Sequence, residues 1–210
     1  MEKHRKIAEK YDSFLPVLRF QQVHTFLVDR HSPLLYNGEK QKGGDHVLLW
    51  AKTMKDLNFD RLMQVYAEGN RENAQAFYPH MEPEKGQLCA EQDFWNYLTE
   101  DFFRQKGACY AIWEENGEYM AALRLEPWED GLLLEALETH PDHRRQGHAK
   151  HLISELQQAL PEATIYSHVS KRNRASLATH KACGFQILKD TVRLLDGTVS
   201  ANSYTLRWSK

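Results

Sequence analysis

Two dipeptides in the middle of the chain, Asn116-Gly117 and Asp130-Gly131, constrain the fold most. They separate three apolar runs between residues 108 and 140, each of strand length. Asn-Gly and Asp-Gly readily take the backbone angles of tight hairpin turns, so each dipeptide is expected to join two antiparallel strands. The sequence therefore predicts a three-stranded antiparallel meander.

Further helix and strand patterns flank the meander. Apolar residues at helical spacing indicate helices, and short apolar runs indicate strands. The predicted elements are a strand over 46–52, helices over 59–77 and 90–103, the meander, a helix over 148–160, a strand over 163–169, a helix over 174–185 and a hairpin over 185–208. This order predicts an α/β fold with a mixed, mostly antiparallel sheet flanked by helices. We expect one domain over residues 46–210, preceded by an N-terminal extension over residues 1–45 whose structure is left open.

The composition is that of an ordinary soluble protein. The formal charge is −2 and hydrophobic residues make up 41%, which gives no sign of a nucleic-acid or membrane partner. The three cysteines are scattered without a CxxC pair, which favours a reducing compartment over a disulfide framework. The N-terminus lacks the apolar core of a signal peptide, and no apolar run has the length of a membrane span. We therefore expect a cytoplasmic protein. Whether it is a monomer or a homodimer is left open.

Charge is distributed unevenly along the chain. Between Glu72 and Glu138 there are 15 acidic and 4 basic residues, a local charge of −11. From Thr139 to the end there are 5 acidic and 11 basic residues, a local charge of +6. Solvated surface accounts for most residues of this kind. The asymmetry also fits a protein with one electropositive site and one electronegative site.

The stretch HPDHRRQGHAKH, from His140 to His151, joins the last strand of the meander to a helix. Its histidines allow a zinc site, but the arginines and the lysine among them would repel a cation, so we expect no metal. A helix N-terminus offers unpaired N–H groups and a partial positive charge, which bind phosphate. Gly147 lets a ligand approach the backbone closely. The stretch therefore predicts a phosphate-binding loop, with His140, His143, His148 and His151 as turn and helix-surface residues.

Two motifs resemble those of one family. Arg144-x-x-Gly147-x-Ala149 resembles the [Q/R]-x-x-G-x-[G/A] motif of the GNAT superfamily of N-acetyltransferases, and LEALETHPDH before it resembles the family's fourth strand and turn. NRASLATHKACGF, residues 173–185, is similar to the family's N-x-x-[A/S]-x-x-x-[Y/H]-x-x-x-G-F segment. The resemblance covers about residues 46–208. It implies the GNAT fold and transfer of the acetyl group of acetyl-CoA to an amine by direct attack, without an acetyl-enzyme.

The resemblance also implies which residues hold acetyl-CoA. The loop and helix end would bind its diphosphate, and backbone N–H groups near residues 137–139 would polarise the thioester carbonyl where two strands splay apart. Asn173 and Ser176 would contact the pantetheine arm, with helix capping as their structural alternative. The expected acetyl-CoA residues are Leu137, Glu138, Thr139, Arg144, Arg145, Gln146, Gly147, His148, Ala149, Lys150, Asn173, Ser176 and His180.

Three residues are candidates for catalysis. His180 stands where many relatives have a tyrosine, and it either protonates the leaving thiolate or merely lines the thiol. Glu135 and Glu138 lie on the central strand and are candidate bases. A regular strand would put them on opposite faces, whereas a bulge, which the resemblance implies, would change that. We slightly prefer Glu135, and a water chain is the alternative base.

The leading hypothesis is an acetyl-CoA-dependent N-acetyltransferase. Its acceptor is expected to be a cationic small molecule or peptide amine, because the acidic half of the chain supplies the acceptor-side elements. The alternative is a non-catalytic acyl-CoA-binding or sensing module on the same scaffold, since a fold does not prove a chemistry. The sequence does not name the acceptor.

Overall fold

A computed structural model describes residues 46–193 and 198–210. The predicted N-terminal extension lies outside the described residues, as do residues 194–197 within the hairpin predicted over 185–208. The helices are η1 (Met54–Asp56), α2 (Phe59–Val65), α3 (Ala67–Phe77), α4 (Pro83–Glu100), η2 (Phe102–Arg104), η3 (Pro141–His143), α5 (His148–Ala159) and α6 (Arg174–Ala182). The strands are β1 (His46–Ala51), β2 (Cys109–Glu115), β3 (Glu118–Trp128), β4 (Gly131–Thr139), β5 (Ile165–Ser170), β6 (Gln186–Lys189), β7 (Val192–Arg193), β8 (Val199–Ser200) and β9 (Ser203–Trp208).

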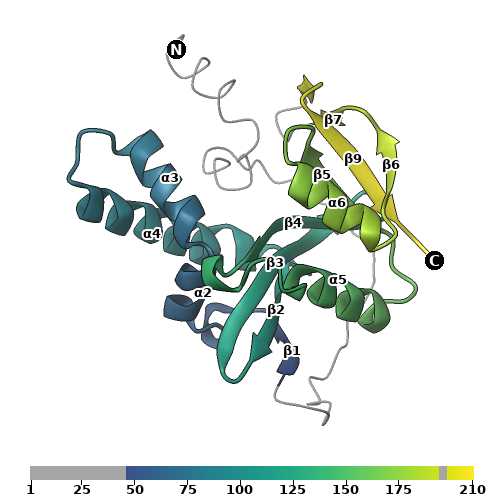
Figure 1. Cartoon of the computed structure of the whole chain (residues 1–210), viewed down its shortest axis with the longest axis horizontal. Helices are drawn as coiled ribbons and strands as arrows, with labels where there is room; N and C mark the ends of the chain where they lie inside the picture. The colour runs from purple at the N-terminus through teal and green to yellow at the C-terminus, as the bar shows by residue number, and fades with distance from the viewer. Residues whose placement is uncertain (1–45, 194–197) are drawn as a thin grey trace.

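Seven of these strands form one sheet in the order β1-β2-β3-β4-β5-β9-β6 (Figure 1). All neighbours in it pair antiparallel except β4 and β5, which are parallel. This arrangement confirms the predicted mixed, mostly antiparallel sheet and the predicted meander, which is β2-β3-β4. The short strands β7 and β8 pair separately.

The two meander turns differ in how they use glycine. In the first, Asn116 and Gly117 both have positive φ angles, 51° and 81°, as the prediction requires. In the second, the positive φ of 46° belongs to Glu129, and Gly131 already begins β4. A Cβ atom at Gly131 would lie 2.1 Å from the carbonyl oxygen of Thr164. Gly131 is therefore required by the close approach of another backbone and not by the turn.

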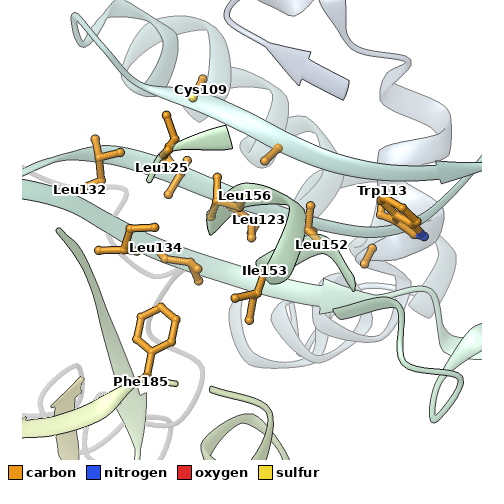
Figure 2. Close-up of a cluster of buried hydrophobic side chains, with 14 of the residues drawn as sticks. Cys109, Trp113, Leu123, Leu125, Leu132, Leu134, Leu152, Ile153, Leu156 and Phe185 are labelled. Carbon is orange, nitrogen blue, oxygen red and sulfur yellow. The ribbon is translucent and has the colours of Figure 1, made fainter. Parts of the chain in front are cut away.

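The sheet carries a hydrophobic core on each face. On one face α5 packs Leu152, Ile153 and Leu156 against inward side chains of β2 to β5, such as Leu123 and Leu134 (Figure 2). On the other face α2 and α4 pack against side chains of β2 and β3, such as Tyr110 and Ala122. In Figure 1 α2, α3 and α4 accordingly lie together, away from α5 and α6. The alternation of strand side chains puts one residue in two into each core.

Two helices differ from their predicted bounds. The helix predicted over 59–77 is broken at Tyr66, which ends α2 and begins α3 with φ −92° and ψ 12°. The helix predicted from residue 90 already begins at Pro83. Proline at the first position of a helix is a start signal, because its missing N–H has no partner there anyway. The longer α4 was thus readable from Pro83.

The strand β4 is irregular near its end. Its register against β3 shifts between Ala122 and Arg124, and Ala136 opposite this shift has a positive φ of 50°. Two residues of β4 therefore face one of β3, which is a β-bulge. The pairing of β4 with β5 covers only residues 132–134, although both strands run further. The two strands diverge from that point, as predicted.

Candidate active site

The loop between β4 and α5 has the geometry of an anion-binding turn. Arg145 and Gly147 have positive φ angles of 65° and 93°, and α5 begins directly after them at His148. The first amides to bond within the helix are those of Lys150 and His151, which both donate to the carbonyl of Gly147. The amides before them point out of the helix end, toward any ligand there. This backbone arrangement suits a diphosphate.

The side chains of this loop point in different directions. Arg145, Gln146 and Lys150 are exposed. His148 is buried, with 7% exposure, and its Nδ1 lies 3.2 Å from Oε1 of Glu115 on β2. The expectation that His148 is a helix-surface residue is therefore wrong. The first helical residue faces inward because α5 packs across β2.

Arg144, which opens the motif, points toward the other side of the site. Its Nη1 donates a hydrogen bond to Oε2 of Glu68 on α3. Its Nη2 lies 3.9 Å from Oε2 of Glu138 on β4. About two fifths of the Arg144 side chain is exposed, so solvent screens both ion pairs. Arg144 thus links the loop between β4 and α5 (the phosphate-type loop) to the acidic residues of α3 and β4.

The bulge in β4 brings both candidate carboxylates to one face of the sheet. Glu135 pairs with Arg124 and Glu138 pairs with Ala122, two residues apart on β3. Residues two apart on a strand share a face, so Glu135 and Glu138 do as well. It is the face covered by α2 and α4, since Ala122 belongs to that core. The opposite-face arrangement expected for a regular strand does not hold.

Glu135 is engaged by a buried cation. Its Oε2 lies 3.6 Å from Nη2 of Arg124, whose side chain is only 1% exposed. The guanidinium of Arg124 also stacks over the rings of Tyr97 and Phe102, at 4.9 and 5.6 Å from the ring centres. A buried arginine needs a counter-charge close by, and this carboxylate supplies it. Glu135 therefore stabilises the fold as the counterion of Arg124.

Glu138 has the properties of a base that works near neutral pH. Its pKa is raised to about 7, mainly by burial and also by the neighbouring carboxylates Glu68 and Glu72, against the lowering effect of Arg144. Its side chain is nevertheless 37% exposed, so solvent or a small substrate can reach it. A base is most effective when its pKa lies near the working pH. The contacts favour Glu138 over Glu135 for this role.

The second motif forms the start of α6. Asn173 caps the helix, and its Oδ1 accepts a hydrogen bond of 3.0 Å from the amide of Ser176. The capping alternative for Asn173 is thus realised. Asn173 is exposed and Ser176 is half-buried, so a ligand can reach both residues.

His180 is buried inside α6, with 1% exposure. Its Nδ1 lies 2.8 Å from the carbonyl oxygen of Ser176, which only accepts, so Nδ1 carries the proton. Nε2 has no hydrogen-bond partner among the described residues. Burial lowers the pKa of His180 below its usual 6.5. The ring is therefore neutral near pH 7, with a bare acceptor at Nε2.

Three residues of the site were not singled out from the sequence. They are Tyr66, Glu68 and Arg124, which come from the α2–α3 junction, from α3 and from β3. Tyr66 donates from its hydroxyl to the carbonyl of Ala136, at 2.6 Å. For Arg124 the sequence does contain a signal. It stands in the middle of the strand EYMAALRLEPW, and a charged residue is rare in such an apolar run.

The described parts of the chain show neither a metal cluster nor a membrane span. Among residues 46–193 and 198–210 no group of three or more His, Cys, Asp or Glu side chains is placed to hold a metal ion. Within the same residues no helix is long and apolar enough to cross a membrane. All three cysteines are free thiols.

Comparison with known proteins identifies the family. The model of the acetyltransferase (GNAT) family matches residues 74–185, more than half of the chain, and the chain therefore belongs to this family. No curated protein matches the sequence.

Solved structures share the fold. PaiA N-acetyltransferase from Thermoplasma acidophilum, in complex with coenzyme A, has 11% identity and a TM-score of 0.51, over 78% of this chain and 99% of that one. A proposed acetyltransferase from Acinetobacter baylyi has 15% identity and a TM-score of 0.50, over 79% and 94%. At such identities the likeness concerns the fold alone.

Proposed function

We propose that this protein is an N-acetyltransferase that moves the acetyl group of acetyl-CoA to the primary amine of a cationic small molecule or peptide. The amine nitrogen attacks the thioester carbonyl carbon, the carbon–sulfur bond breaks, and coenzyme A leaves as a thiol. The ammonium that forms loses a proton, and the thiolate gains one. One observation carries the proposal. Glu138, a carboxylate with a pKa of about 7, follows the β4 bulge and neighbours Arg144, which opens the phosphate-type loop.

Acetyl-CoA would bind with its diphosphate on the loop and on the N-terminus of α5. The positive φ angles of Arg145 and Gly147 turn the backbone so that successive amides can converge on an anion. Arg145 and Lys150 are exposed beside it and add formal charge. The thioester would then extend into the gap between β4 and β5, which stop pairing after Leu134 and Ser167. Backbone amides of residues 137–139 would donate to its carbonyl.

Glu138 would act as the base, directly or through a water molecule. A neutral amine is required for attack, and a carboxylate that titrates near pH 7 can accept the proton that the nitrogen loses. Glu135 would contribute by neutralising Arg124 rather than by moving a proton. We therefore assign the base to Glu138, in place of the slight preference for Glu135 that the sequence suggested.

His180 would stand beside the thiol at the position of the family's tyrosine. Its Nδ1 proton is held by Ser176, so only a doubly protonated ring could give a proton from Nε2 to the thiolate. Burial disfavours that form. His180 therefore contributes to protonation only through a small protonated fraction, which grows as the pH falls.

The acidic residues around the base support a cationic acceptor. Glu68, Glu72 and Glu138 interact electrostatically, and each raises the energy of placing further negative charge there. An acceptor that carries a second positive charge would relieve this repulsion. Three free cysteines support a reducing compartment, and we propose the cytoplasm.

An amine panel with release of free coenzyme A as the readout tests this function. The panel contains a diamine, a polyamine, a lysine-containing peptide, an uncharged monoamine and an amino acid with an extra carboxylate. Acetylation of the di- or polyamine, with little turnover of the acidic amine, is the expected result. Binding of acetyl-CoA without turnover of any amine would instead support a non-catalytic acyl-CoA sensing module. The lack of an Nε2 proton on neutral His180 is the observation that favours this second function.

A further inference from the structure

The side chain of Tyr66 reaches from the layer formed by α2, α3 and α4 (the helical layer) to the active-site strand β4. Tyr66 is the junction residue between α2 and α3, and it is 4% exposed. Its ring packs against Phe94 of α4 and Tyr110 of β2, with ring centres 5.5 and 6.5 Å apart. These contacts hold the ring, and therefore the hydroxyl, in one place.

The hydroxyl of Tyr66 contacts the bulge in β4. It donates to the carbonyl oxygen of Ala136 over 2.6 Å. Burial raises the pKa of Tyr66 well above its usual value, so the hydroxyl keeps its proton and remains a donor. Ala136 has a φ of 50°, in the left-handed region that residues with a Cβ atom rarely adopt. That conformation costs about 1 to 2 kcal/mol for a residue other than glycine, so it persists only where surrounding contacts hold it.

Holding this carbonyl also fixes the next amide. A trans peptide is planar, and its C=O and N–H point in opposite directions. The carbonyl of Ala136 and the N–H of Leu137 belong to the same peptide. With the carbonyl directed at Tyr66, the N–H of Leu137 must point away from the helical layer. Leu137 is the first of the residues whose amides would meet the thioester carbonyl.

We propose that Tyr66 is a positioning residue for catalysis, whose hydroxyl holds the peptide between Ala136 and Leu137 in the orientation that polarises the thioester carbonyl. This role rests on the proposed acetyl transfer. Tyr66 acts through the backbone and touches neither the acetyl group nor the amine. The bulge alone does not ensure the orientation, because Ala136 is not a glycine and gains nothing intrinsically from its left-handed conformation.

The test uses the infrared band of acetyl-CoA labelled with ¹³C at the thioester carbonyl, bound to the whole protein. Hydrogen bonds to this carbonyl lower its stretching frequency, so the band reports polarisation without any acceptor amine. The variants are Tyr66→Phe, and Tyr166→Phe as the matched control. Tyr166 on β5 is also 4% exposed, and its hydroxyl also makes a hydrogen bond of 2.6 Å, but to the carboxylate of Asp130 just before β4 and not to the backbone of the bulge.

We expect the band of bound acetyl-CoA to lie at higher frequency in Tyr66→Phe than in wild type, with Tyr166→Phe at the wild-type position. The affinity for acetyl-CoA, measured by calorimetry, should change less than about twofold, and single-turnover acetylation should slow at least about tenfold. Ala136→Gly in the Tyr66→Phe background should move the band back toward wild type, since glycine accepts the left-handed conformation freely.

Two results would overturn the role of Tyr66 but leave the proposed function in place. One is a wild-type band in Tyr66→Phe, and the other is a double variant no closer to wild type than Tyr66→Phe. A wild-type protein that binds acetyl-CoA without any lowering of the band would instead contradict the proposed function itself, because the carbonyl would then not be polarised at all.

Discussion

Arg124 of β3 and Glu135 of β4 form an ion pair beneath the helical layer, with Nη2 and Oε2 3.6 Å apart and exposures of 1% and 12%. The arginine is further enclosed by the rings of Tyr97 and Phe102. Removing the charge of one partner leaves the other buried without its counterion, which typically destabilises a fold by about 3 to 5 kcal/mol. This pair explains why a carboxylate stands in the middle of a half-buried strand.

Glu135→Gln should therefore lower the free energy of unfolding by about 3 kcal/mol, measured by urea denaturation at pH 8. The control is Glu118→Gln. Glu118 is 67% exposed and lies 3.7 Å from His143, and its loss should change stability by less than about 0.5 kcal/mol. Equal stability of the Glu135 variant and wild type would show that Arg124 does not depend on this carboxylate.

The pH dependence should follow Glu138. Acetylation should rise as the pH increases through about 7, as the carboxylate forms. Glu138→Gln should lower the single-turnover rate by about 10² to 10⁴-fold and remove this rise. Glu68→Gln should shift the midpoint to lower pH, since Glu68 raises the pKa of Glu138. A midpoint that stays in place in Glu138→Gln would assign the base to another group.

Stability should move in the opposite direction to activity. The pKa of Glu138 is raised in the folded state, so the folded protein binds the proton more tightly than the unfolded chain does. Stability is then lost as the pH rises from about 4.5 to about 7. Glu138→Gln should cancel this loss, and its melting temperature at pH 8 should equal or exceed that of wild type.

Short-range patterns predicted the elements that carry the site, but not the contacts among them. The meander, α5 and α6 follow from turn dipeptides and helical spacing over a few residues. Ala136 carries no such signal, because a bulge depends on the partner strand, and a regular strand would put Glu135 and Glu138 on opposite faces. The pairing of Arg144 with Glu68 joins residues 76 positions apart, so only the assembled fold brings them together. The inward turn of His148 likewise results from packing against β2.

Gly147→Asp should weaken acetyl-CoA binding at least tenfold, or about 1.4 kcal/mol. Aspartate adds a side chain and a negative charge where the diphosphate is expected. Calorimetry on the folded variant gives the measurement. Gly147→Asn adds nearly the same bulk without the charge, and asparagine tolerates a positive φ, so it should bind better than the aspartate variant.

Gly117→Asp is the control for backbone strain. Gly117 has a φ of 81°, close to the 93° of Gly147, but it lies in the hairpin between β2 and β3. The Gly117→Asp variant should be less stable than wild type but should bind acetyl-CoA with the same affinity. An unchanged affinity in Gly147→Asp would mean that the diphosphate binds elsewhere.

The contribution of His180 should increase as the pH falls. Only its doubly protonated form has a proton at Nε2, and burial keeps its pKa below 6.5. The ratio of single-turnover rates between wild type and His180→Ala should therefore be larger at pH 6 than at pH 8.5. His180→Phe should behave like alanine, whereas His180→Tyr should retain much of the activity, because its hydroxyl is a donor over the whole range. A ratio of one at every pH would reduce His180 to a lining residue.

The most direct measurement is a rapid-quench single turnover of the whole protein, in excess over acetyl-CoA labelled in its acetyl group, with the best amine of the panel. Mass spectrometry then follows the label on acetyl-CoA, on the protein and on the amine. The account predicts that the label passes from acetyl-CoA to the amine at the rate at which coenzyme A appears, with none on the protein. Label on a protein side chain before the amine would contradict direct attack. Acetyl-CoA that stays bound and intact with every amine would contradict acetyl transfer itself.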